Sequence, residues 1–126
     1  MITSFCEDNA GNAAVAEFIL PLAEATKLWS DITMEVGRKA MANADEVGAA
    51  SVDYLYFSGY VALAYWWARA VATAESGNYP EDFKSAKRET ARFYFARLLP
   101  RTQTHAAAMR SGPASLLALD AALFDS

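Results

Sequence analysis

Hydrophobic positions recur at helical spacing in the first third of the chain. They follow alternating steps of three and four through Val15, Phe18, Leu22, Ala25, Trp29, Ile32 and Val36. This spacing puts all of these side chains on one stripe of an α-helix. It predicts a helix over about 12–42, with Asn12 as candidate N-cap and a kink at Pro21, which lacks a backbone donor. Residues 1–11 are expected to form an N-terminal segment ahead of it.

The middle of the chain predicts a second helix over about 51–76. A break at 43–48 precedes it, and Gly77 follows it as a candidate left-handed residue at the helix end. No charged residue interrupts the run from Tyr54 to Ala68. This run is shorter than the ~20 residues that cross a bilayer. We therefore expect it to be a helix that is buried on most sides.

A third helix is predicted over about 80–110. Pro80 suits its first position, because the donor that proline lacks would be unpaired there anyway. Two acidic residues follow Pro80 and complement the positive end of the helix dipole. Pro100 should kink this helix by depriving one carbonyl of its partner. A shorter helix over about 114–124 closes the chain.

These elements predict an all-α fold. No alternating strand pattern and no hairpin signal occurs, and short connections make consecutive helices antiparallel neighbours. We expect an antiparallel bundle of three long helices plus a shorter C-terminal helix, four-helix-bundle-like, in one domain over 1–126. Residues 1–53 hold nine acidic and three basic side chains, and 80–126 hold five acidic and seven basic ones. The first and third helices are therefore complementary in charge.

Composition narrows the partners and the compartment. Hydrophobic residues make up 54% and charged residues 21%, as in a globular protein. The net charge of −4 argues against a nucleic-acid partner and against binding to a membrane surface. Both are negatively charged and are bound by proteins with a surplus of Lys and Arg. Cys6 is the single cysteine and cannot form an internal disulfide, and no signal-peptide pattern opens the sequence. These features favour a cytoplasmic protein.

No recognisable catalytic, cofactor-binding or metal-binding motif is present. The Glu-x-x-His pairs of di-iron bundles are missing, since Thr102 stands three positions before His105. Gly-x-Ser-x-Gly, Walker and Gly-x-Gly-x-x-Gly patterns are also absent. Glu7 and Asp8 disfavour a thiolate at Cys6. We expect His105 to be an exposed or half-buried polar residue and Cys6 an inert thiol.

Two groups of side chains remain as candidate sites. Lys84, Arg88 and Arg92 form one stripe at four-residue intervals, either facing the phosphates of a cofactor or lying on a solvated face paired with the acidic first helix or a neighbouring subunit. An aromatic group is a candidate interface or pocket, although such residues more often form a core or a subunit contact. Its members are Tyr54, Tyr60, Trp66, Trp67, Phe93 and Tyr94.

Two segments closely resemble a known family. They are Asp53-Tyr-Leu-Tyr-Phe-Ser-Gly-Tyr-Val-Ala-Leu-Ala-Tyr-Trp-Trp-Ala-Arg69 and Lys87-Arg-Glu-Thr-Ala-Arg-Phe-Tyr-Phe-Ala-Arg-Leu-Leu-Pro100. Both are similar to the additional C-terminal domain of a bacterial acyl-CoA dehydrogenase subfamily that includes the 3-methylmercaptopropionyl-CoA dehydrogenases. The end of the chain, from Gly112 to Phe124, also looks like that family's closing segment. The specific resemblance covers about 51–124.

The resemblance implies a function for a parent protein. In that family the extra domain follows a flavoprotein body, which holds FAD and the carboxylate that removes the α-proton of an acyl thioester. It implies an accessory domain with FAD in the parent, no cofactor and no catalytic residue in this chain, and the flavoprotein body as partner. We also expect a homo-oligomer, because excision would bare hydrophobic faces. The alternative is a free-standing helical module whose aromatic second helix binds an apolar or acyl ligand.

Overall fold

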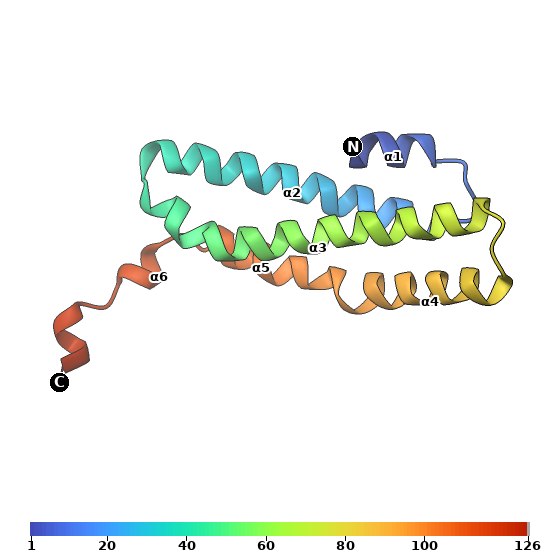
Figure 1. The fold of residues 1–126 in the computed structure, drawn as a ribbon. Coiled ribbons are helices and arrows are strands. Elements are labelled where there is room, and N and C mark those ends of the chain that lie inside the picture. The colour runs from blue at the N-terminus through green and yellow to red at the C-terminus, as the bar shows by residue number, and fades with distance from the viewer. Residues whose placement is uncertain (126) are drawn as a thin grey trace.

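The computed structural model describes residues 1–125, so Ser126, the last residue of the predicted domain, lies outside the described part. The helices are α1 (Ile2–Asp8), α2 (Ala16–Ala42), α3 (Asp45–Ser76), α4 (Glu81–Arg97), the 3-10 turn η1 (Leu99–Arg101), α5 (Thr102–Arg110), α6 (Ala114–Leu117) and the 3-10 turn η2 (Ala121–Asp125). No strand occurs among residues 1–125. α2, α3 and the α4–α5 segment lie beside one another and run in alternating directions: α2 and α4–α5 run from right to left in Figure 1, and α3 runs from left to right. The prediction of an all-α antiparallel bundle is confirmed.

The N-terminal segment is more ordered than the sequence indicates. Its residues form α1, which lies beside α2 (Figure 1). The Phe5 ring meets the Tyr65 ring edge-on with centroids 5.5 Å apart, and Cys6 is buried between the helices. Asn12 makes the return turn: its Oδ1 accepts a hydrogen bond from the Ala14 N–H at 3.1 Å. Because Asn12 is used in this turn, it is not the N-cap of α2, which begins at Ala16.

α3 extends over 32 residues and begins earlier than predicted. The break before it is only a short turn, in which Oδ1 of Asn43 accepts a hydrogen bond from the Asp45 N–H at 3.1 Å. At its other end, Gly77 has φ −93° and ψ 172°, so the predicted left-handed conformation is wrong. The extended backbone there carries the chain across to α4. The glycine with positive φ is Gly112, at 75°, just after α5.

Two prolines act differently on their helices. α2 continues through Pro21, which lies early in the helix and removes one backbone bond. Pro100 instead separates α4 from α5 through η1, at the position where the sequence predicts a kink. The hydroxyl of Thr102 donates to the Leu99 carbonyl at 2.7 Å and supports this turn. Pro100 is disruptive because it falls in the middle of a long helical run.

The C-terminal segment differs from the single helix expected over 114–124. It forms α6, which lies at the end of the bundle next to the start of α3, and then η2, which extends away from the bundle (Figure 1). Oδ1 of Asp120 accepts a hydrogen bond from the Ala122 N–H at 3.0 Å, and this bond forms a turn at the start of η2. The large apolar side chains of this segment are exposed; they are Leu116, Leu117, Leu119, Leu123 and Phe124.

The core lies along the inner side of α3. Its large, fully buried side chains are Phe18, Leu22 and Ile32 of α2, Phe57, Val61 and Val71 of α3, and Val15. The small residues Ala64, Ala68 and Ala91 are buried as well and allow the helices to approach closely. The Tyr94 hydroxyl donates to the Tyr60 carbonyl at 2.6 Å and ties α4 to α3.

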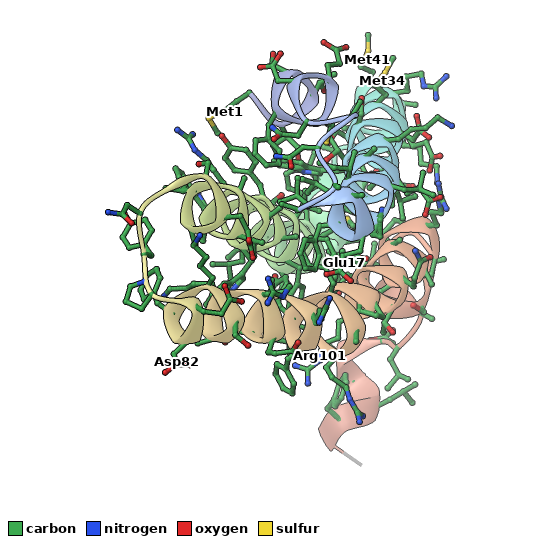
Figure 2. All side chains as sticks on the ribbon, turned by 90° about the vertical axis from the view of Figure 1, so that its right-hand side faces the viewer. Met1, Glu17, Met34, Met41, Asp82 and Arg101 are labelled. Atoms are coloured by element: carbon green, nitrogen blue, oxygen red, sulfur yellow. The ribbon has the colours of Figure 1, made fainter. Side chains whose placement is uncertain are left out.

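Ion pairs join the acidic first long helix to the basic third one. Arg92 Nε donates a hydrogen bond to Glu17 at 2.9 Å, and Arg110 donates two hydrogen bonds of 3.0 Å to the Glu35 carboxylate. The Arg110 guanidinium lowers the pKa of the Glu35 carboxyl through these bonds. In the view along the bundle, Glu17 points toward α4, whereas Met34 and Met41 point outward (Figure 2). Charge complementarity therefore fixes which helices are neighbours.

Replacing Phe57 tests the inner side of α3. Phe57 is 0% exposed, so Phe57→Ala should lower the free energy of unfolding by about 3–5 kcal/mol, as buried Phe→Ala changes do. Leu55→Ala is the matched control, because Leu55 is 71% exposed on the same helix and should change stability by less than about 0.5 kcal/mol. Urea unfolding followed by circular dichroism measures both. Equal losses would contradict the assignment of inner and outer sides.

Replacing Tyr94 tests the link between α3 and α4. Burial, and next the nearby Tyr60, raise the pKa of Tyr94 to about 12. The unfolded hydroxyl ionises near pH 10, so this group's contribution to stability is complete below about pH 10 and is lost as the pH rises toward 12. Tyr94→Phe should cost about 1 kcal/mol at neutral pH by removing the hydrogen bond. It should also lose less stability than the wild type between neutral and alkaline pH; an identical alkaline loss in urea unfolding would refute this account.

Candidate functional site

One side of α3 is apolar and open to solvent. We call it the outer face, and it consists of Val52, Leu55, Tyr56, Gly59, Leu63 and Trp66. The exposed fractions of its large side chains run from 51% at Leu63 to 71% at Leu55. Five of its members follow steps of four and three, the spacing of a helix–helix seam; they are Val52, Tyr56, Gly59, Leu63 and Trp66.

The opposite side of the same helix already forms the core. Phe57, Val61 and Ala64 are fully buried there, and no charge lies between Asp53 and Arg69. A helix that is apolar all round is normally covered all round. Ten of the fifteen residues from Tyr54 to Ala68 are buried or half-buried, in line with the expectation of a mostly buried helix, but the outer side of α3 is left open. Its outer half is suited to contact another surface.

The aromatic group predicted as an interface or pocket does not converge on one cavity. Tyr94 is buried, Trp66 and Phe93 are exposed, and Tyr54, Tyr60 and Trp67 are partly buried against the core. The Tyr54 hydroxyl is hydrogen-bonded to that of Thr33 at 2.9 Å, which joins α3 to α2. Of the six residues, Trp66 is the one that lies on the outer face.

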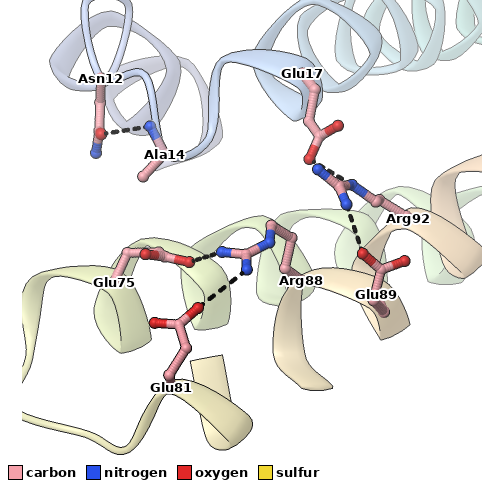
Figure 3. Close-up of polar contacts among 8 residues, drawn as sticks. All are labelled: Asn12, Ala14, Glu17, Glu75, Glu81, Arg88, Glu89 and Arg92. Carbon is pink, nitrogen blue, oxygen red and sulfur yellow. Dashed lines mark hydrogen bonds and ion pairs between the residues drawn. The ribbon is translucent and has the colours of Figure 1, made fainter. Parts of the chain in front are cut away.

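The predicted anion-facing stripe is largely occupied by carboxylates. Arg88 pairs with Glu75 and Glu81, and Arg92 pairs with Glu17 and Glu89 (Figure 3). Lys84 on the same helix is half-buried. A phosphate at this stripe would have to displace these carboxylates, so its arginines serve to hold helices together.

Sequence reasoning did not find the pair formed by Asp53 and His105. Nδ1 of His105 lies 2.8 Å from Oδ1 of Asp53, and the imidazole stacks on the rings of Tyr56 and Tyr60 at centroid distances of 5.4 and 5.8 Å. A carboxylate can only accept a hydrogen bond, so Nδ1 of His105 donates in this contact. The sequence offered one signal for this pair: Asp53 stands just before the uncharged run from Tyr54 to Ala68, and an imidazole is a suitable hydrogen-bond partner for its carboxylate. The pair fastens α5 to α3.

Other groups that could support chemistry are placed unfavourably. Burial and, second, Glu7 raise the pKa of the Cys6 thiol, so the reactive thiolate is disfavoured. Among residues 1–125 no cluster of three His, Cys, Asp or Glu side chains is arranged to hold a metal ion. Within the same residues, every helix is too short or too polar to traverse a membrane. Among the described residues, the outer face of α3 is therefore the candidate site that remains.

Comparison with known proteins assigns the family. The family described as "Acetyl-CoA dehydrogenase C-terminal like" matches residues 1–120. No curated protein and no solved structure is similar enough to match the chain. Because the family match spans α1 to α6, the chain belongs to the acetyl-CoA dehydrogenase C-terminal-like family.

Proposed function

We propose that this chain is the accessory C-terminal domain of an FAD-dependent acyl-CoA dehydrogenase and that it docks on the flavoprotein body through the outer face of α3. In this proposal FAD and the acyl thioester bind to the body, and the domain acts in assembly without chemistry of its own. One observation carries the proposal: a domain of this family exposes an uncharged, apolar helix face with the spacing of a helix seam.

The resemblance to the 3-methylmercaptopropionyl-CoA dehydrogenase subfamily supports this choice of surface. The segment from Asp53 to Arg69, which carries much of that resemblance, also contains Leu55, Tyr56, Leu63 and Trp66 of the outer face. We therefore propose a parent enzyme from that subfamily. The lone buried thiol of Cys6 suits a reducing compartment, and we propose the cytoplasm.

The outer face offers enough surface to hold a tethered domain. Fully burying one large apolar side chain contributes about 1.5–3 kcal/mol, and the large side chains of the outer face are 51–71% exposed before docking. Docking would therefore gain on the order of 1 kcal/mol for each. A domain that is covalently linked to the body needs little further binding energy to stay docked, because the linkage gives it a millimolar effective concentration. In the free chain the same face would pair with a second copy, so we propose a homo-oligomer for that form.

Site-specific cross-linking tests the docking surface. The photoreactive residue p-benzoylphenylalanine is placed at Leu63, in the protein as the cell makes it, and the products are mapped by mass spectrometry. We expect cross-links to peptides of an acyl-CoA dehydrogenase body, because position 63 lies in the middle of the outer face.

The matched control places the same residue at Lys27 of α2, whose side chain is 82% exposed. It should give no cross-link to the body. The proposal is wrong if position 63 gives no product, or if its products join only two copies of residues 1–126.

A further inference from the structure

A cleft lies where the C-terminal half of α3 meets α4. Its volume is about 290 Å³, and α3 contributes Trp66, Arg69 and the small residues Ala70, Thr73 and Ala74. Tyr79 of the connecting segment and Phe83 and Lys87 of α4 complete the lining. The small side chains of α3 leave room between Trp66 and the opposite rings. The cleft thus combines aromatic surfaces with two cations.

Each aromatic surface of the cleft carries one of these cations. The Arg69 guanidinium lies 5.5 Å from the centre of the Trp66 ring and donates to the Tyr65 hydroxyl at 2.8 Å. Lys87 Nζ lies 5.1 Å from the centre of the Phe83 ring. Among residues 1–125, neither cation has a carboxylate within ion-pair distance, in contrast to neighbouring Arg88 and Arg92. In a protein of net charge −4, this leaves a local positive site suited to an anion.

The position of the Tyr79 ring depends on Gly77. A Cβ at position 77 would lie 2.8 Å from Cδ2 of Tyr79, inside van der Waals contact. The Tyr79 ring can lie against the end of α3 because Gly77 has no side chain. There it stacks on Phe83 with centroids 4.9 Å apart and planes inclined by 26°. Both rings line the cleft, and we call the stacked pair the Tyr79–Phe83 wall.

We propose that this cleft binds a nucleotide, with the base stacked against Trp66 and the Tyr79–Phe83 wall and the phosphate held by Arg69 and Lys87. A planar base can stack on the aromatic side chains of the cleft, and such stacking depends little on which base is present. A phosphate satisfies two cations that lack carboxylate partners. The site uses no Gly-rich loop, which is why the sequence motifs do not reveal it. The cleft shares Trp66 with the outer face of α3, whereas Arg69, Tyr79, Phe83 and Lys87 lie outside that face, so variants of these residues test the cleft separately from docking.

The test uses the purified 126-residue chain with ADP as the probe, followed by tryptophan fluorescence and calorimetry at low salt. ADP should bind saturably at one site and quench Trp66, which is 53% exposed. Adenosine and inorganic pyrophosphate, which lack the phosphate and the base respectively, should each bind at least about tenfold more weakly than ADP. Equal binding of pyrophosphate and ADP would reduce the site to a surface charge effect and overturn the proposal. Absence of saturation by ADP at millimolar concentration would also overturn it.

Variants separate the cleft from general charge. Arg69→Ala and Lys87→Ala should each weaken ADP binding about tenfold, as loss of a charged hydrogen bond does. Arg97→Ala removes an exposed cation of α4 that does not line the cleft, and it should bind ADP like the wild type. Gly77→Ala should keep the helical circular dichroism spectrum, because the Tyr79 ring is the group that must move furthest and the Thr73 carbonyl, 3.2 Å from the added Cβ, needs only a small shift. It should weaken ADP binding. If Arg97→Ala weakens binding as much as Arg69→Ala, the cleft is not the site.

Discussion

The apolar character of α3 on opposite sides is the constraint on which the rest of this structure depends. Its inner side, with Phe57 and Val61 at the centre, packs against α2, α4 and α5 and forms the core. Its outer face has the same helical spacing, but its large side chains are 51–71% exposed. Because a charge on either side would weaken one of the two contacts, the run from Tyr54 to Ala68 contains none. One helix is therefore the centre of the domain and also carries the docking surface that we propose.

The charged residues divide the remaining surface into two kinds. Arg92 and Arg110 are bound to carboxylates of the acidic α2 and align it with the basic α4–α5 segment, and Arg88 ties α4 to Glu75 of α3. Arg69 and Lys87 instead lie on aromatic rings beside the cleft at the end of α3. Exposed ion pairs contribute only about 0–1 kcal/mol each, so the first group selects neighbours more than it stabilises the fold. The second group leaves positive charge free to interact with a ligand.

The parts of this fold that depend on local chemistry could be predicted from the sequence. The steps of three and four through α2 and the missing donor at Pro100 each act within one or two helical turns. Element ends were less predictable: Asn12 can cap a helix or close a turn, and the sequence does not show which. The contact between Asp53 and His105 joins residues 52 positions apart, so it depends on how α5 lies on α3. The exposure of the outer face could not be predicted either, because an uncharged run has the same sequence pattern whether one side of the helix or both sides are covered by other helices.

Thiol labelling measures most directly whether the outer face of α3 is a contact surface. Cys6 is the single cysteine of residues 1–126, so a Cys6→Ala background with Leu63→Cys gives this domain one labelling site, whose labelled peptide is followed by mass spectrometry. Ala107→Cys, at an exposed position of α5, serves as the reference. The account predicts that a maleimide reacts with Cys at 63 rapidly in the unfolded chain and slowly in the protein assembled with its flavoprotein body. The reference position should react rapidly in both. Rapid reaction at position 63 in the assembled enzyme would contradict the central claim.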